Sequence, residues 1–338
     1  MNQLEKFAEK LRRGWASWYV RIAFGGALSV LAFVWVFSQV EISEVVLFLR
    51  QASGGYLFLG LMSVCLNVFA KVLRWRVLLG AKGQQISLQT LGGVMLSSQL
   101  VNAMLPGRVG DIGRIWALGQ STEKTFVLGT IVIEKWVDTI AFAFLFLLVL
   151  FWIPLPGWIE GSVWGLLSVV TLGSVGLIAA VYYAEALMDF FVVFVRRFPN
   201  RVQTWVKARS ISGFSSLKQM RATPTWLSTV GWTSVIWATA VFNNYMGMRA
   251  LNVRLPLFVA VVLLIGLQVG IVMTASPGAL GVFEYICMLT LTFWGVERSL
   301  ALGVGLVLHL LVYLPLLLGG IWPLLRWGIP SFEKRGKG

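Results

Sequence analysis

Long apolar stretches with few charges recur along this chain, and they restrict its fold more than any other feature. A helix needs roughly 20 apolar residues to cross the hydrocarbon core of a bilayer. Six runs come close to or exceed this length, at residues 21–40, 55–73, 125–152, 162–183, 224–247 and 300–325. Hydrophobic residues make up 58% of the chain, more than in a typical soluble domain. Regular alternation in short segments is missing, so the sequence predicts an all-α polytopic membrane protein.

Two further apolar runs, 86–105 and 256–276, end in the same motif, P-G-x-x-G. The motif residues are Pro106, Gly107 and Gly110 in the first copy and Pro277, Gly278 and Gly281 in the second. Pro and Gly interrupt helices and free backbone groups that cannot face lipid, so a break at membrane depth must be buried or line a wet cavity. A single copy would be ordinary turn chemistry. Two copies about half a chain apart, each followed by a carboxylate, indicate a repeated design.

The Lys and Arg residues gather in short segments that flank the apolar runs. The connector at 186–221 is strongly basic, whereas the loop at 153–161 has neither Lys nor Arg. By the positive-inside rule, both termini face the cytoplasm and the number of crossings is even. A full crossing by 86–105 would place the basic connector outside. We therefore predict about six spanning helices plus two re-entrant helical hairpins, at 86–120 and 256–294.

These hairpins define an inverted repeat within a single integral membrane domain, 1–338. Residues 55–152 are repeat 1 and residues 224–325 are repeat 2, which is inverted because an odd number of crossings separates corresponding points. Inverted repeats with interrupted helices are a common transporter plan, in which the breaks point to the binding site. Residues 1–20 are predicted to form an amphipathic N-terminal segment on the membrane surface.

Three motifs carry a resemblance to a known family. They are N-x-x-L-P-G-R-x-G-D-x-x-R ending at Arg114, E-K-x-x-D ending at Asp138, and P-G-x-L-G-x-x-E ending at Glu284. In this order and spacing, the chain resembles the flippase-like transmembrane family of lysylphosphatidylglycerol synthases over about residues 20–325. That family includes the membrane half of the multiple peptide resistance factor and stand-alone bacterial flippase-like membrane proteins. One departure is Asp111, where the family more often has Glu.

The resemblance implies translocation of a phosphate-bearing, glyco- or aminoacyl lipid across the cytoplasmic membrane. It implies the flippase-like part alone and not lysyl transfer, because the residues after Pro330 are too few to form the soluble synthase domain of fused members. The alternative is a membrane-embedded transferase or a scaffold subunit for modification of a lipid-linked glycan or a phospholipid. No catalytic residue is assigned, since the common hydrolase and nucleotide-binding motifs are absent; the sequence favours a transporter over an enzyme.

Five charged residues near the first break are candidate substrate contacts. Arg108 and Arg114 could hold a phosphate bidentately, and Asp111 could orient one of them. The alternative is a solvated loop whose Arg residues only set topology. Glu134 and Asp138 lie four residues apart on one face of a predicted span, where carboxylates usually face the bundle interior. They could bind an Arg of the break or take a proton, or they could form a structural ion pair.

Three further residues are candidates elsewhere in the apolar runs. Glu284 has no Lys or Arg near it in sequence, and an unpaired intramembrane carboxylate is a candidate functional group. We expect Glu284 to bind a cationic headgroup or to couple protons. Lys71, on one helical face with Arg74, could reach a lipid phosphate or snorkel to the interface. His309, the only histidine, could relay protons or be a satisfied polar residue between helices.

The net charge of +14 raises the question of nucleic acid. Because the cations flank apolar runs, they fit anionic headgroups instead, and no nucleic-acid partner is predicted. The predicted partner is a membrane lipid: an anionic phospholipid, a polyprenyl-phosphate or a glycolipid. A separate synthase or glycosyltransferase partner and a homo-oligomer are left open. Cys65 and Cys287 lie in apolar runs and are predicted to pack there; no cofactor and no metal are predicted.

Overall fold

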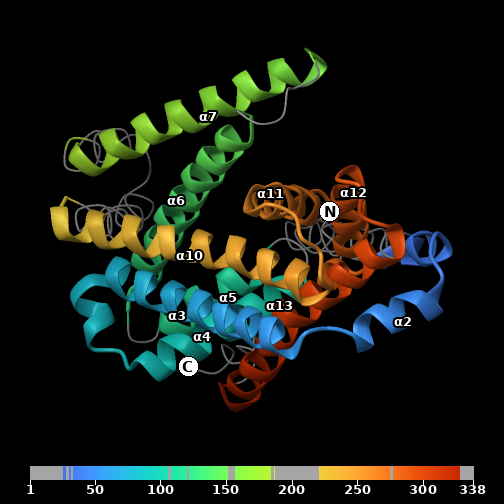
Figure 1. Ribbon diagram of the computed structural model, residues 1–338. Helices are drawn as coiled ribbons and strands as arrows, with labels where there is room; N and C mark the ends of the chain where they lie inside the picture. Colours follow the sequence, from blue (N-terminus) through green and yellow to red (C-terminus); the bar gives the residue numbers. More distant parts are fainter. Residues whose placement is uncertain are drawn as a thin grey trace, which may run out of the picture. The chain divides into compact units, whose positions relative to one another are not determined.

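The protein is helical in the part of the chain that its structure describes. The computed structural model describes residues 26–27, 30–31, 33–105, 108–119, 122–150, 157–183, 186, 221–274 and 277–327, and no strand occurs in these ranges. The helices are shown in Figure 1. In chain order they are α2 (Ile42–Arg50), α3 (Gly54–Gln84), α4 (Leu88–Met104), α5 (Val109–Leu118), α6 (Lys124–Leu150), α7 (Gly157–Tyr182), α10 (Thr223–Ala250), α11 (Leu257–Thr274), the 3-10 turn η1 (Pro277–Ala279), α12 (Val282–Phe293) and α13 (Arg298–Trp327).

The helices coincide with the predicted apolar runs. Helices α3, α6, α7, α10 and α13 overlie five predicted spans, and the pairs α4/α5 and α11/α12 overlie the two broken runs. By length and composition, α3 and α13 are each able to cross a membrane. The predicted span at 21–40 is described only in part, and the segments 1–20 and 187–220 lie outside the described residues. The all-α prediction is confirmed for the described residues, while the number of crossings, the re-entrant course of the hairpins and the inverted repeat stay predictions.

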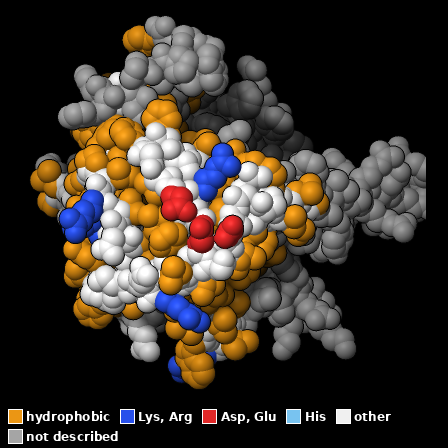
Figure 2. Space-filling view, turned by 45° about the vertical axis from the view of Figure 1, so that its right-hand side comes forward, with side chains coloured by type: hydrophobic (Ala, Val, Ile, Leu, Met, Phe, Trp, Pro, Cys, Tyr) orange, Lys and Arg blue, Asp and Glu red, His pale blue; other side chains and the backbone are white. Residues whose placement is uncertain are grey.

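Large hydrophobic side chains are exposed along most of the described helices. Examples are Phe58 on α3, Leu172 on α7 and Leu325 on α13, with exposed fractions of 61%, 72% and 75%. Figure 2 shows a face on which hydrophobic side chains predominate among the described residues and charged ones are few. Monomeric soluble proteins rarely expose apolar surface on this scale. Lipid tails, by contrast, solvate such a surface, so the exposed residues suit a bilayer.

The described residues divide into two compact units. Unit 1 takes the residues up to Leu61 together with Gln99–Gly110 and Asn243–Leu317. Unit 2 takes Met62–Ser98, Asp111–Phe242 and the residues from Leu318 onward. The candidate site residues on α3, α5 and α6 therefore belong to unit 2. Both P-G-x-x-G breaks belong to unit 1, as does Glu284.

The core of unit 2 forms where α3, α4, α5 and α6 turn their apolar faces toward one another. Its buried members are Val72, Trp75, Leu79, Leu91, Val94, Met95, Leu118, Phe126, Val127 and Ile131. Leu78 of α3 joins a second group with Ile133 and Val137 of α6 and with Val181 of α7. This packing holds the charged faces of α3, α5 and α6 in fixed positions.

Helix α3 continues beyond residue 73, where the predicted span ends. Trp75 is fully buried in the core just past that point, so the apolar face does not stop there. At the far end, the Arg76 guanidinium donates to the carbonyls of Gly83 and Gln84, at 3.3 and 3.4 Å. These bonds satisfy carbonyl groups that a helix end leaves without an intrahelical partner. The residues after the predicted span therefore extend the helix as far as a kink at Gly80, whose φ of 57° is not helical, and a short helical piece follows up to Gln84.

Glycines bring the helices of unit 1 close together. Gly270 of α11 faces the Ile286 side chain of α12, and Gly247 of α10 faces Leu308 of α13. A Cβ at Gly305 of α13 would lie 3.3 Å from the Cα of Glu284 in α12. Small residues that let backbones approach are typical of helix packing in membranes. The contact at Gly305 sets α13 directly against the start of α12.

The two breaks share a backbone feature. In the P-G-x-x-G motif, the third residue is Arg108 in the first copy and Ala279 in the second, and both have a left-handed φ, of 55° and 51°. The amide of the final glycine is satisfied by a side chain in each copy. Gly110 N–H donates to Asn102 Oδ1 at 2.8 Å, and Gly281 N–H donates to the Glu284 carboxylate at 2.8 Å. Pro106 and Gly107 lie outside the described residues.

Candidate functional site

Seven charged side chains, four of them buried and three half-buried, form a network in unit 2, which we call the charge cluster. The members on α3 are three residues apart, as are those on α5, so each pair lies on one helical face. On α6, two members are four residues apart on one face, and the third directly follows the first of them. The members are Lys71 and Arg74 on α3, Asp111 and Arg114 on α5, and Glu134, Lys135 and Asp138 on α6. Each helix thus brings at least one cation to the network, and α5 and α6 also bring carboxylates.

The centre of the charge cluster is a bidentate pair between Arg114 and Glu134. The two guanidinium nitrogens of Arg114 donate to the two carboxylate oxygens of Glu134, at 3.1 and 2.7 Å. Both side chains are almost completely buried, at 1% and 6% exposure. The Arg114 guanidinium also lies 4.0 Å from the centroid of the Trp75 ring and 3.6 Å from an Asp111 oxygen. This is the structural ion pair that the sequence left as an alternative, and it joins α5 to α6.

A second bidentate pair joins α3 to α6. The two terminal nitrogens of Arg74 donate to the two carboxylate oxygens of Asp138, at 2.5 and 3.0 Å. Arg74 also donates to the Thr233 hydroxyl of α10 at 3.0 Å and lies 4.0 Å from Glu134. Arg74 is 1% exposed. It is therefore a buried member of the network rather than a topology signal at a helix end.

The charge cluster carries more positive than negative charge. Lys135 bridges Asp111 and Glu134 at 3.3 and 3.5 Å. Lys71 is half-buried and interacts electrostatically with Asp138. Four cations therefore meet three carboxylates, which leaves one positive charge in excess among largely apolar helices.

Two donors within the charge cluster have no acceptor. The Nε–H groups of Arg74 and Arg114 are buried and lack a hydrogen-bond partner among the described residues. Buried polar groups are nearly always paired, so each such donor requires an explanation. An excess positive charge and two unpaired guanidinium donors together form an arrangement that favours an anion with several acceptor oxygens. No group of three or more His, Cys, Asp or Glu side chains in the described residues is arranged to hold a metal.

A separate pair of buried titratable groups lies next to the second break, in unit 1. Glu284 is 1% exposed; one of its oxygens accepts from Gly281 N–H, and the other lies 2.6 Å from His309 Nδ1. The imidazole lies against the rings of Phe283 and Tyr313, with centroid distances of 4.9 and 4.2 Å. The expectation that Glu284 would be unpaired is therefore wrong, because its partner comes from α13, far along the sequence.

One more predicted site residue, Arg108, is exposed at the first break. The sequence-based prediction named Arg74 only as a neighbour of Lys71, and it named Glu284 and His309 as two separate candidates. No local signal marked Arg74 as a site residue, because the predicted apolar span ended at residue 73, one position before it. The link between Glu284 and His309 had no local sequence signal.

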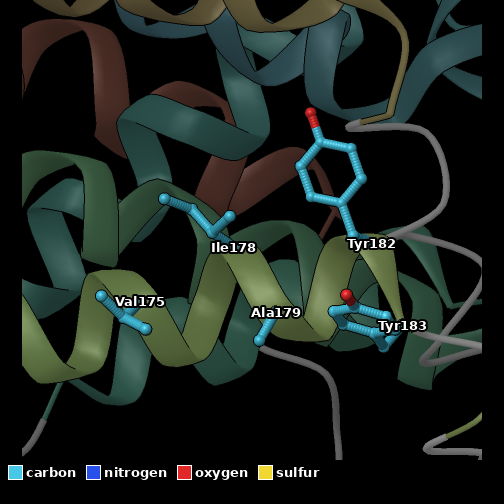
Figure 3. A pocket seen from close by; sticks show the side chains of 5 residues that line it. All are labelled: Val175, Ile178, Ala179, Tyr182 and Tyr183. Atoms are coloured by element: carbon cyan, nitrogen blue, oxygen red, sulfur yellow. The ribbon is translucent and has the colours of Figure 1, made fainter.

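The surface of unit 2 also has a hollow. It is lined along α7 by Val175, Ile178, Ala179, Tyr182 and Tyr183 (Figure 3). Apart from two phenol hydroxyls, its lining is apolar. None of the charge-cluster residues lines it, so it is not the candidate site.

The sequence of this chain matches a known protein family. A model of the lysylphosphatidylglycerol synthase TM region matches residues 22–320. The chain belongs to this family. The family resemblance inferred from the three motifs is thereby confirmed, and the charge cluster, both breaks and Glu284 all fall inside the matched region of this lysylphosphatidylglycerol synthase TM region protein.

A curated relative agrees with this family membership. The chain is 21% identical over 324 residues to UPF0104 membrane protein PH1989 of Pyrococcus horikoshii, which corresponds to 90% of this chain and 95% of that protein. The similarity therefore extends over nearly the full length of both chains. Together with the apolar helices α3 and α13, the two matches identify the chain as a membrane protein.

Proposed function

We propose that this protein translocates a lipid with a phosphate-bearing, glycosylated or aminoacylated headgroup across the cytoplasmic membrane. The observation that carries the proposal is the excess positive charge of the charge cluster, which is largely enclosed by helices that expose large hydrophobic side chains. Charged residues within membrane proteins are costly and commonly mark a substrate path. Membership in a family named for the membrane region of a lipid synthase supports a lipid as the substrate.

The chemistry of the charge cluster favours a phosphate group over a neutral headgroup. A phosphate offers several acceptor oxygens, and guanidinium and ammonium groups bind it with charge-assisted hydrogen bonds. Lys135 is the most exposed of the described ion-pair members, with 34% of its side chain accessible, and Lys71 is half-buried. These two ammonium groups would meet the phosphate first. Exposed Arg108, in unit 1, is proposed to contact the phosphate at the break.

The two breaks support a transporter plan. Interrupted helices in related halves of a transporter commonly form the substrate site. Arg108 and Ala279, at the same position of the two motifs, have the same left-handed backbone, which supports the proposal that the halves are related by an inverted repeat. In the proposed topology, the two broken runs are re-entrant hairpins and both termini are cytoplasmic.

The test is translocation in reconstituted liposomes. Purified protein is placed in vesicles that contain lipids with fluorescent headgroups, and a membrane-impermeant quencher then reports lipid that reaches the outer leaflet. The variant Lys71→Met removes the excess charge and leaves both bidentate pairs intact. The matched control is Lys82→Met, because Lys82 lies over the Phe126 ring and outside the charge cluster.

We expect the wild type to expose inner-leaflet phospholipid faster than empty vesicles do. Loss of one charge-assisted contact should slow Lys71→Met about tenfold or more, while Lys82→Met should match the wild type. If the wild type equals empty vesicles for neutral, anionic and polyprenyl lipids, with and without a proton gradient, the translocation proposal is wrong. Assays for product formation and for co-purifying synthases would then distinguish a transferase from a scaffold.

A further inference from the structure

The pair formed by Glu284 and His309 connects a broken helix to its neighbour. Through Gly281, the Glu284 carboxylate holds the last residue of the second break, and through His309 it holds α13. Gly281 has a φ of 79°, so the backbone immediately before α12 is not helical. A single buried carboxylate therefore ties the broken backbone to an adjacent helix, and any change in its charge or partners acts directly on the break.

The charge of this pair depends on one proton. With Glu284 ionised, His309 Nδ1–H donates to it, and His309 Nε2 is either bare or protonated. The pair then has a net charge of −1 or zero. Among the described residues, His309 is the one basic side chain in ion-pair contact with Glu284. The other titratable groups that interact with Glu284 are Cys287 on α12 and Tyr313 on α13.

No described residue of α11, which packs against α12, adds a charge to the surroundings of Glu284. Its sequence, Leu257–Thr274, contains no titratable side chain. Helix α10, which packs against α13 at Gly247, has Tyr245 and Arg249, and the Arg249 guanidinium donates to the Tyr56 hydroxyl of α3 at 3.5 Å. Cys287 and Tyr313 carry no positive charge in any protonation state. An uncompensated carboxylate is costly in a buried site, and in the described surroundings a proton on the imidazole would supply the compensating charge.

We propose that Glu284 and His309 form a proton-binding site whose occupancy sets how tightly the second break is held. The proton comes from water and binds His309 Nε2, and no other bond is made or broken. Uptake changes the pair from a neutral donor and a charged acceptor to an imidazolium–carboxylate pair. Hydrogen bonds between two charged partners are shorter and stronger than bonds with a neutral partner. The protonated pair thus holds Gly281 and α13 together more firmly than the deprotonated pair.

The direction of the pH effect follows from this charge balance. Histidine is the side chain that ordinarily changes its charge between about pH 5 and pH 8. The second break should be held firmly at the acidic end of this range and loosen as the pH rises and His309 loses its proton. The site is a property of the break itself, so this inference does not depend on which lipid, if any, the protein moves.

The first measurement uses the fact that His309 is the only histidine in the chain. Full-length protein labelled with nitrogen-15 histidine is reconstituted in lipid, and the two imidazole nitrogen signals are recorded from pH 5 to pH 8. We expect the imidazole to change from the doubly protonated form to the form protonated at Nδ1 within this range. Imidazole signals that stay neutral throughout, or that show Nε2–H with bare Nδ1, would overturn the proposal.

The second measurement links the proton to the break. Amide hydrogen exchange of residues 277–285 is followed at both ends of the pH range and expressed as protection factors, which remove the intrinsic pH dependence of exchange. We expect protection in the wild type to be about tenfold higher at the acidic end, as the gain from a doubly charged hydrogen bond implies. Wild-type protection that does not change with pH would refute the link.

Three variants separate the proton from simple packing. Glu284→Gln keeps an acceptor for Gly281 but removes the carboxylate, and His309→Gln removes the titrating ring; both should abolish the pH dependence of protection. Tyr313→Phe keeps the ring against the imidazole and removes the nearby hydroxyl, so it should behave like the wild type. A pH dependence that survives in both glutamine variants would show that another group is responsible.

Discussion

Neutralising Glu134 tests whether the charge cluster is an electrostatic network or a chance meeting of charges. The variant Glu134→Gln keeps the side-chain volume and one acceptor oxygen, but removes the charge that faces three cations. Those cations are Arg114 at 2.7 Å, Lys135 at 3.5 Å and Arg74 at 4.0 Å. The substitution leaves two carboxylates against four cations in the same buried volume, so repulsion among the cations is no longer balanced.

The magnitude follows from distance and burial. Unit charges about 4 Å apart interact by about 4 kcal/mol at the effective dielectric of about 20 that describes protein sites. The side chains of Glu134 and Arg114 are 6% and 1% exposed, so solvent screening does not reduce this value much. Breaking a buried ion pair by removing one partner typically costs about 3–5 kcal/mol. We therefore expect Glu134→Gln to lower the free energy of unfolding by about 3–4 kcal/mol.

The assay is equilibrium unfolding of the purified protein in mixed micelles, with the double variant Arg114→Met/Glu134→Leu as the matched control. The double variant removes one cation and one carboxylate, so the excess of one positive charge is unchanged. Replacing a whole buried pair by apolar side chains is often neutral or stabilising, so the double variant should be more stable than Glu134→Gln. A loss of about 0.5 kcal/mol or less in Glu134→Gln, which is the usual effect of a surface substitution, would refute the reasoning.

Two further predictions concern the backbone of unit 1. Gly278 and Ala279 both have a left-handed φ, of 67° and 51°. Equilibrium unfolding should therefore show that Gly278→Ala destabilises the protein and that Ala279→Gly stabilises it, each by about 1 kcal/mol. Changes in stability of the same sign for both variants would contradict the left-handed assignment. A Cβ at Gly305 would lie 3.3 Å from a backbone atom of α12, whereas a Cβ at Gly303 would meet the flexible end of a leucine side chain at 3.1 Å. Gly305→Ala should therefore lower the unfolding midpoint more than Gly303→Ala, and equal effects would show that α12 can move away.

The helices could be predicted from the sequence because their signals are local. The apolar runs gave positions close to those of α6, α10, α11 and α13, and the P-G-x-x-G motifs correctly predicted an interruption in each of two runs. The end of α3 was not predicted, because the cause lies in tertiary contacts: Trp75 is buried in the core of unit 2. Hydrophobicity alone does not distinguish a basic helix end inside a protein from one at a membrane surface.

The candidate site could be predicted only in part. Spacing placed Glu134 and Asp138 on one face of a helix, and the structure pairs both with arginines. The choice of partner was beyond the sequence, because Arg74 is separated from Asp138 by 64 positions and nothing local indicates that α3 packs against α6. The pairing of Glu284 with His309 was missed for the same reason.

The two carboxylates that follow the two breaks lie in different electrostatic settings, which separates their roles. Asp111 contacts two cations of the charge cluster, Lys135 and Arg114. Glu284 contacts a histidine, the type of side chain that ordinarily changes its charge between about pH 5 and pH 8. A site that brings several cations together suits the binding of an anionic group, whereas a site with one exchangeable proton suits control of a backbone break. If the halves of the chain arose from one repeated unit, the two proposals together assign anion binding to the motif in one half and proton binding to it in the other.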